Sequence, residues 1–148
     1  MRFRPDFLGR PKRGFWVKNI LVVDDLYSIR RLFWRFLESR DCHVEMAANA
    51  VEAIAAFKKY SFDLAFIDVE PKIGMDGIEL AKFLRSQKQD LPIVIMSARF
   101  EYEEEVRAEN FEDFFLKGID FDLGKIGSYV QKYTGLNPNA KLEKPNAE

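Results

Sequence analysis

Short, almost wholly apolar runs alternate along this chain with segments of helical periodicity, and this alternation constrains the fold more than any other feature. Strand patterns lie at residues 20–23, 43–47, 62–68, 91–97 and 111–116. Most are apolar nearly throughout, as strands buried on both faces of a parallel sheet are. Apolar stripes predict helices over 26–37, 50–57, 80–84 and 123–133, and 101–109 is a poor helix. Five strand–helix units with short connections predict an α/β fold, a doubly wound parallel sheet with helices on both faces.

The length of 148 residues is typical of one domain with tails. We expect the domain to span residues 19–135. A basic N-terminal extension, residues 1–18, precedes it, and either a flexible leader or a docking arm with aromatic side chains fits its composition. Residues 136–148 carry Asn137-Pro138 and Pro145, which predict a frayed C-terminal tail.

Overall charge and apolar run lengths narrow the possible partners and location. The net charge of −1 gives no bulk attraction to nucleic acid. No apolar stretch reaches the roughly 18 residues of a spanning helix, so membrane insertion is not expected. A single cysteine, Cys42, forms no internal disulfide, which favours a cytoplasmic protein. We expect a monomer or a weak dimer.

Polar side chains follow four of the predicted strands at the point where each strand ends. Asp24 and Asp25 follow the first strand, Asp68 ends the third, Ser97 ends the fourth and Lys117 follows the fifth. Ligands of open α/β sheets bind at the carboxyl ends of the strands. Three carboxylates, a hydroxyl and an ammonium at that edge suit Mg²⁺ and a phosphoryl group.

The chain resembles the receiver domain of two-component response regulators, over roughly residues 18–134. The matching motifs, in chain order, are Val22-Val23-Asp24-Asp25, Ile67-Asp68 with Met75-Asp76-Gly77, Met96-Ser97-Ala98, and Phe114 three residues before Lys117. The resemblance implies a flavodoxin-like sheet with strand order 2-1-3-4-5. It also implies a phosphorelay protein that a sensor histidine kinase or a histidine phosphotransfer protein phosphorylates.

The resemblance assigns roles to individual residues. Asp68 is the expected phosphoacceptor, Lys117 pairs with a phosphoryl oxygen, and the Ser97 hydroxyl binds another oxygen. Phe114 turns inward behind Ser97 as the switch residue. The implied ligands of Mg²⁺ are Asp24 through a water, Asp25, Asp68 and the backbone carbonyl of Glu70.

The chain departs from the family pattern at three places. The loop after Asp68 carries one extra residue, with Pro71 one position early, which could shift the Glu70 carbonyl. The family's Lys-Pro pair is Lys117-Gly118 here, and we expect a trans peptide. The segment between Ser97 and Lys117 is about two residues short and rich in glutamate, which predicts either a poor helix or a solvated acidic loop.

Output without a DNA-binding domain is expected, because too little chain follows residue 134; signalling would pass to an unidentified downstream protein or by onward phosphotransfer. The alternative is a pseudo-receiver, a protein-binding module that works without phosphate. A flavin carrier fits poorly, since the acidic pair stands where a phosphate loop should be. Nor is a conventional enzyme expected: the only histidine, His43, is predicted at the far end of a strand from the acidic residues.

Two further surface predictions concern partners and phosphoryl lifetime. Tyr27, Arg31 and Trp34 are predicted to lie opposite the core stripe of the first helix and to dock the phosphodonor. Glu70 and Arg99 are predicted to form an ion pair at the opening of the site and to modulate the lifetime of the phosphoryl group.

Overall fold

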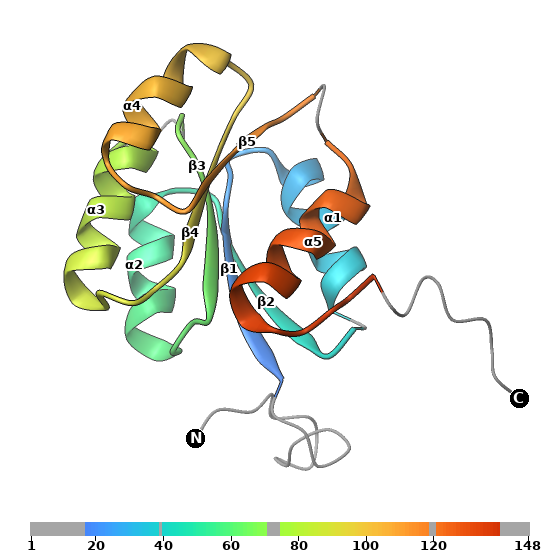
Figure 1. Cartoon of the computed structure of the whole chain (residues 1–148). Helices are drawn as coiled ribbons and strands as arrows, with labels where there is room; N and C mark the ends of the chain where they lie inside the picture. The colour runs from blue at the N-terminus through green and yellow to red at the C-terminus, as the bar shows by residue number, and fades with distance from the viewer. Residues whose placement is uncertain (1–16, 39, 71–74, 119–120, 140–148) are drawn as a thin grey trace, which may run out of the picture.

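The fold has three layers, a central parallel sheet with helices on both faces (Figure 1). The computed structural model describes residues 17–38, 40–70, 75–118 and 121–139. The strands are β1 (Lys18–Val23), β2 (Cys42–Ala47), β3 (Leu64–Asp68), β4 (Ile93–Ser97) and β5 (Asp113–Leu116). The helices are α1 (Tyr27–Leu37), α2 (Ala50–Lys59), α3 (Gly77–Gln87), α4 (Glu103–Ala108) and α5 (Leu123–Thr134), and the 3₁₀ turn η2 (Phe100–Tyr102) precedes α4.

The sheet has the order β2-β1-β3-β4-β5 with every pairing parallel, which confirms the predicted fold and strand order. The register aligns the carboxyl ends of the strands: Val23 pairs with Ile67, Asp68 with Met96, and Ser97 with Leu116. The polar residues that end or follow these strands therefore meet at one edge of the sheet.

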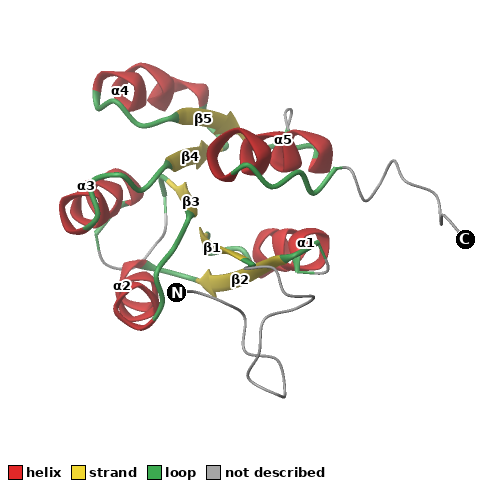
Figure 2. Cartoon of the chain, turned by 60° about the horizontal axis from the view of Figure 1, so that its bottom comes forward, coloured by secondary structure: helices red, strands yellow, loops and turns green. Residues whose placement is uncertain are grey.

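Two apolar clusters fill the space on either side of the sheet. One joins β-strand side chains to α2, α3 and α4, and includes Phe114 and Val106. The other joins them to α1 and α5, and includes Phe33 and Phe66, whose rings lie 4.9 Å apart. Figure 2 shows the two groups of helices on opposite faces. As predicted, β3 and β4 are buried throughout.

The buried helical stripes are narrower than the sequence predicts. In α1, Phe33, Phe36 and Leu37 are buried, whereas Leu32 is 42% exposed, and Leu26, the residue just before the helix, is 52% exposed. The reason is geometric, because α1 contacts the sheet along one line and residues at the margin of the stripe lie beyond it. Phe83 in α3 and Leu123 in α5 are exposed for the same reason.

The acidic segment before β5 forms a short helix, in agreement with the poor helix predicted there. Of the six residues of α4, Val106 alone is buried. The guanidinium of Arg107 lies 2.7 Å from the Glu103 carboxylate, and the ammonium of Lys82 in α3 lies 3.1 Å from Glu109. These cations offset part of the repulsion among the glutamates.

The compact part of the chain extends beyond the predicted range of 19–135 at both ends. Val17 is buried and Lys18 already belongs to β1. After α5 the chain reverses at Gly135, and residues 135–139, the C-terminal segment, run back along α5 on the side of α1 (Figure 2). Leu136 packs against the α1–α5 cluster, and the Asn139 amide donates a hydrogen bond of 2.9 Å to the Gly124 carbonyl. A frayed tail beginning at residue 136 is therefore wrong for residues 136–139.

Three of the predictions concern segments that the structure does not describe. The basic extension up to residue 16, the tail beyond residue 139 and the extra loop residue within 71–74 lie outside the described residues. Within the described part of the chain, no helix has the length and apolar character needed to cross a membrane.

Candidate functional site

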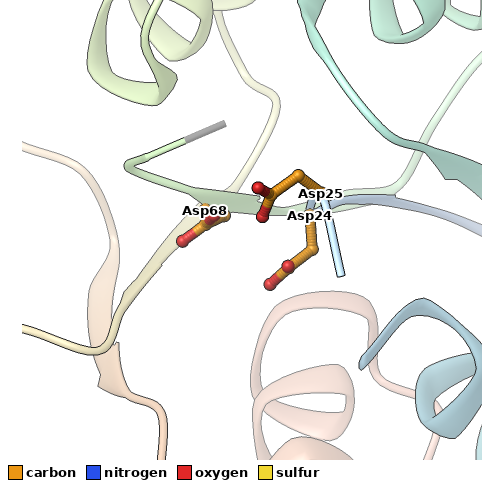
Figure 3. Close-up of side chains that lie close together, drawn as sticks. All are labelled: Asp24, Asp25 and Asp68. Atoms are coloured by element: carbon orange, nitrogen blue, oxygen red, sulfur yellow. The ribbon is translucent and has the colours of Figure 1, made fainter. Parts of the chain in front are cut away.

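Three carboxylates gather at the carboxyl edge of the sheet, as predicted. Asp24 and Asp25 follow β1 and Asp68 ends β3 (Figure 3). One oxygen from each lies within 4.8 Å of the other two. Asp24 and Asp68 are buried, and Asp25 is half-buried. We call these three residues the acidic cluster.

The acidic cluster fits a hard divalent cation. Mg²⁺ takes six oxygens at about 2.0–2.1 Å in an octahedron, so its ligand oxygens stand about 3–4 Å apart. The observed separations are close to that range, and three carboxylates without a cation repel one another. Mg²⁺ also retains several waters, which leaves room for oxygens of a phosphoryl group.

Lys117 neutralises part of this negative charge. Its ammonium lies 2.8 Å from Asp24 Oδ2 and 3.2 Å from Asp68 Oδ1, with little exposure to solvent. Burial works to lower the pKa of Lys117, but the hydrogen bond to Asp24 and the charges of both aspartates outweigh it and raise the pKa. The lysine therefore stays protonated at neutral pH, beside the carboxylate that is expected to take the phosphoryl group.

Asp68 is a destabilised carboxylate. Burial, followed by the charge of Asp24, raises its pKa to about 6, although Lys117 opposes the shift. An unfavourable ionised state is relieved when a cation binds or when the charge is moved onto a bound phosphoryl group. The electrostatics of the site thus favour cation-assisted chemistry at Asp68.

Ser97 is completely buried at the end of β4, next to the strand that ends in Asp68. Its hydroxyl oxygen accepts a 2.9 Å hydrogen bond from the Arg99 backbone N–H. Accepting this bond leaves the hydroxyl proton free to be donated. Ser97 is thus able to donate to an anion at the site while it holds the following turn in place.

Phe114 is already buried, among the side chains of the α2–α3–α4 cluster. The predicted inward turn of its ring on phosphorylation stays a prediction. Because only 8% of the residue is exposed, any movement of Phe114 would have to rearrange core packing around Val106 and Phe111.

Glu70 and Arg99 meet as predicted. Arg99 Nη1 lies 3.7 Å from Glu70 Oε2; the Arg99 side chain is exposed and the Glu70 side chain is partly buried. The Arg99 side chain also approaches Glu101, with 3.7 Å between Nε and Oε1. The Glu70 backbone N–H is among the groups that lower the pKa of Asp68, so this residue belongs to the rim of the site.

Sequence reasoning missed three contacts that position the acidic cluster. The Asp24 carboxylate accepts a 2.9 Å hydrogen bond from the Leu26 backbone N–H, and Arg30 Nη1 donates to the Asp24 carbonyl at 2.8 Å. Gly77 packs directly on the Asp68 backbone, and a Cβ there would lie 1.9 Å from the Asp68 carbonyl oxygen. The one signal in the sequence was a glycine at the start of a helix, just after the Asp76 cap.

The peptide between Lys117 and Gly118 is trans, as expected. Gly118 has a φ of 85°, a left-handed conformation that proline, with φ fixed near −65°, is unable to adopt. A proline at position 118 would therefore be incompatible with this backbone conformation.

The three residues predicted to dock a phosphodonor share the exposed side of α1. Tyr27 and Trp34 are 59% and 40% exposed, and Arg31 donates to the Tyr27 hydroxyl at 3.3 Å.

Two other residues considered in the sequence have structural roles. Cys42 is buried, which raises its pKa to about 12 and argues against a reactive thiol. His43 lies in β2, where it contacts Glu45 and Glu38.

Comparisons with known proteins agree with this geometry. The sequence model of one protein family, the response regulator receiver domain, matches residues 20–125 of this chain. Sporulation initiation phosphotransferase F of Bacillus subtilis (strain 168) is 32% identical over 122 residues, covering 82% of this chain and 98% of the relative. The transcriptional regulatory protein ResD of the same organism is 39% identical over 94 residues, and there the match spans only 38% of the relative.

Solved structures give the same result. The response regulator TrrA of Thermotoga maritima, in complex with Mg²⁺ and BeF, has a TM-score of 0.70 and 30% identity, covering 79% of this chain and 99% of that one. The chemotaxis protein CheY4 of Vibrio cholerae has a TM-score of 0.70 and 29% identity, covering 79% and 98%. The strand order of the sheet, the polar residues at the strand ends and the length of the match all agree with this family. The chain therefore belongs to the response regulator receiver domains of two-component signalling.

Proposed function

We propose that this receiver domain is a switch that accepts a phosphoryl group on Asp68 from a histidine kinase or a histidine phosphotransfer protein. The observation that carries the proposal is the convergence of Lys117 on Asp24 and Asp68 at the edge where the acidic cluster lies. A cation and a lysine at that place counter the repulsion between the carboxylate and an incoming phosphate.

The chemistry follows from the contacts at the site. An oxygen of Asp68 attacks the phosphorus of the donor phosphohistidine, a P–O bond forms, the P–N bond breaks, and the imidazole leaves. Lys117 balances the charge of the phosphoryl oxygens, and the Ser97 hydroxyl donates to one of them. Mg²⁺, when bound by the acidic cluster and the Glu70 carbonyl, supplies charge neutralisation of the phosphoryl oxygens.

The docking surface for the donor is the exposed side of α1, with Tyr27, Arg31 and Trp34. We propose signalling through contact with an unidentified downstream protein or by onward phosphotransfer. The relative named as a phosphotransferase, matched over 98% of its length, supports the second route. A monomer or weak dimer located in the cytoplasm suits either route.

The test is incubation with acetyl phosphate and Mg²⁺, followed by intact-mass measurement. We expect the wild type to gain one phosphoryl group, and Asp68→Ala to gain none while retaining its fold by circular dichroism. Omission of Mg²⁺ should prevent the gain. A folded wild type that gains no mass would instead support the pseudo-receiver, which binds partners without phosphate.

A further inference from the structure

The only histidine of the chain, His43, lies between two carboxylates near the amino end of the edge strand β2. Its Nε2 atom is 2.6 Å from Glu45 Oε2 in the same strand, and its Nδ1 atom is 3.5 Å from Glu38 Oε2 at the end of α1. Glu38 is buried, and the other two residues are half-buried. The chemistry proposed for Asp68 uses none of these three side chains.

A carboxylate at each ring nitrogen favours the charged form of His43. A neutral imidazole carries a single N–H, and an ionised carboxylate only accepts hydrogen bonds, so the neutral ring can satisfy one of the two neighbours at most. The Nδ1 atom is buried and forms no hydrogen bond within the described part of the chain, so its 3.5 Å contact with Glu38 is an ion pair. That contact therefore depends on the charge of the ring.

The side chains at the end of α2 stay in one charge state near neutral pH. The Tyr60 ring lies beside the imidazole, with 5.7 Å between the ring centroids. Burial and then the charge of Glu45 raise the pKa of the Tyr60 hydroxyl, so the phenol remains neutral. The Lys59 ammonium lies over the Tyr60 ring, 5.7 Å from its centroid, and carries its positive charge throughout this range.

The neighbouring strand adds no charge opposite His43. Its partner in β1 is Asn19, and the charged side chains nearby act on the pKa of the adjacent Cys42; they are Asp41, Asp63 and Lys18. Contact with Glu38 in the first place, and with Glu45, raises the pKa of His43 above its ordinary 6.5, although burial opposes the shift. The two glutamates thus decide the charge of the ring.

Glu38 connects this group to α1. Its backbone N–H donates to the Trp34 carbonyl at 2.9 Å and closes the last turn of the helix. Its second carboxylate oxygen, Oε1, accepts a 2.9 Å hydrogen bond from the Val44 backbone N–H in β2. When His43 is neutral, the carboxylates of Glu38 and Glu45 lose the cation between them, and like charges repel more strongly where solvent is scarce.

We propose that His43 is a pH-sensitive clasp that fastens the last turn of α1, residues 34–37, to β2. The imidazolium joins the carboxylates of Glu38 and Glu45 and holds the turn, whereas the neutral ring, having given its proton to water, releases it. The clasp is fully closed below pH 6.5 and opens as the pH rises through the higher value of the folded protein. The inference is independent of the proposed function, because no step at Asp68 enters it.

The place of the clasp links it to the outer surface of α1. The turn that it holds contains Trp34, whose side chain is 40% exposed. A change of pH near neutrality therefore acts on this surface from the end of the helix that is remote from the acidic cluster.

The first measurement is an NMR titration of the imidazole protons in protein without a histidine tag. Their assignment is unambiguous because the chain has one histidine. We expect a midpoint above 6.5 for the wild type and a lower midpoint for Glu45→Gln, which removes one of the two carboxylates. Asp90→Asn, which removes an exposed carboxylate paired with Lys88, is the control and should leave the midpoint unchanged. A wild-type midpoint at or below 6.5 would overturn the inference.

The second measurement compares amide hydrogen exchange at the ends of two helices, corrected for the intrinsic effect of pH. The Glu38 N–H closes α1, and the Lys88 N–H closes α3 in the same way. All proteins carry Asp68→Asn, because Asp68 itself titrates near pH 6. Between pH 6 and pH 8 the protection of Glu38 should fall about three- to tenfold, and that of Lys88 should stay constant. In His43→Gln the protection of Glu38 should be low at both pH values.

Two outcomes of the exchange measurement contradict the clasp. In one, Glu38 and Lys88 lose protection to the same extent, which indicates a general loss of stability. In the other, His43→Gln keeps the pH dependence of the protein that retains His43. Both are observed in proteins that lack the Asp68 carboxylate, so neither bears on whether Asp68 accepts a phosphoryl group.

Discussion

At the scale of single residues, the main feature is that the site carries more negative charge than its own cation neutralises. Asp24, Asp25 and Asp68 converge, and Lys117 is the ammonium that contacts two of them among the described residues. The pKa of Asp68 is raised to about 6, first by burial and then by the charge of Asp24, so the ionised carboxylate is unfavourable. The ionised form of Asp68 therefore lowers the stability of the folded protein when no cation is bound.

Asp68→Asn should therefore stabilise the protein at pH 7 in the absence of Mg²⁺. Removing the buried charge should raise the free energy of unfolding, measured by urea denaturation, by about 1–3 kcal/mol. The folded pKa lies above the unfolded value of 3.8, so the wild type gains stability as pH falls from above 6 toward 4. The advantage of the variant should shrink over the same range, and millimolar Mg²⁺ should reduce it at pH 7.

The matched control is Asp90→Asn, because Asp90 is 86% exposed and pairs only with Lys88 among the described ion pairs. Its stability should stay within about 0.5 kcal/mol of the wild type at every pH. An Asp68→Asn variant no more stable than wild type at pH 7 would contradict the description of the site as a charge-strained cluster.

The residues at the strand ends could be predicted because a parallel sheet brings all carboxyl ends to one edge. Asp24, Asp25, Asp68, Ser97 and Lys117 needed only the strand pattern to be placed together. Their supporting contacts could not be predicted in this way. The bond from Arg30 to the Asp24 carbonyl depends on a rotamer of a long side chain, and the approach of Gly77 to Asp68 depends on the packing of α3.

At the scale of elements, α1 differs from the other helices in its exposed apolar side chains. Tyr27, Trp34 and Leu32 lie on its outer surface, and a groove between α1 and α5 is lined by Leu32, Phe36 and Leu123 together with Arg35 and Arg40. A mixed aromatic and arginine surface is typical of protein interfaces. The sequence predicted the helix but overestimated its buried stripe, because periodicity gives the direction of a face and not its width.

Trp34→Ala should slow phosphotransfer from a cognate donor protein while leaving phosphorylation by acetyl phosphate unchanged. The indole is 40% exposed, and losing an aromatic anchor costs about 1–2 kcal/mol of binding, or roughly five- to thirtyfold in transfer efficiency at low donor concentration. Phe83→Ala, an equally exposed aromatic on α3, is the control. Equal transfer rates for Trp34→Ala and wild type would remove α1 as the docking surface.

At the scale of the whole molecule, the folded body runs from Val17 to Asn139, and its last five residues lie against α5. The sequence pointed to a tail from residue 136 because asparagine and proline interrupt helices. The sequence did not predict that Gly127 in α5 leaves space for the chain that runs back along the helix. A Cβ at Gly127 would lie 2.3 Å from the Asn139 side chain.

Leu136→Ala tests this packing. The leucine contacts the α1–α5 cluster while partly exposed, so its truncation should lower the free energy of unfolding by about 1–2 kcal/mol. Val51→Ala, at a position that is 68% exposed, should change stability by less than about 0.5 kcal/mol. Equal stability of Leu136→Ala and wild type in urea denaturation would mean that the C-terminal segment adds nothing to the core.

The reversal at Gly135 also decides where a label or a fused protein would sit. A chain that ended with α5 would leave the molecule at the edge of the sheet opposite the acidic cluster. In this protein the Asn139 side-chain amide donates a hydrogen bond to the Gly124 carbonyl, in the first turn of α5. That helix begins on the same side of the molecule as the carboxyl ends of the strands. A fluorophore attached at Asn139 would therefore lie on the side of the sheet that α1 and α5 cover and would test for a donor on the docking surface proposed there, whereas one at Val17 would lie before β1, at the opposite end of the strands.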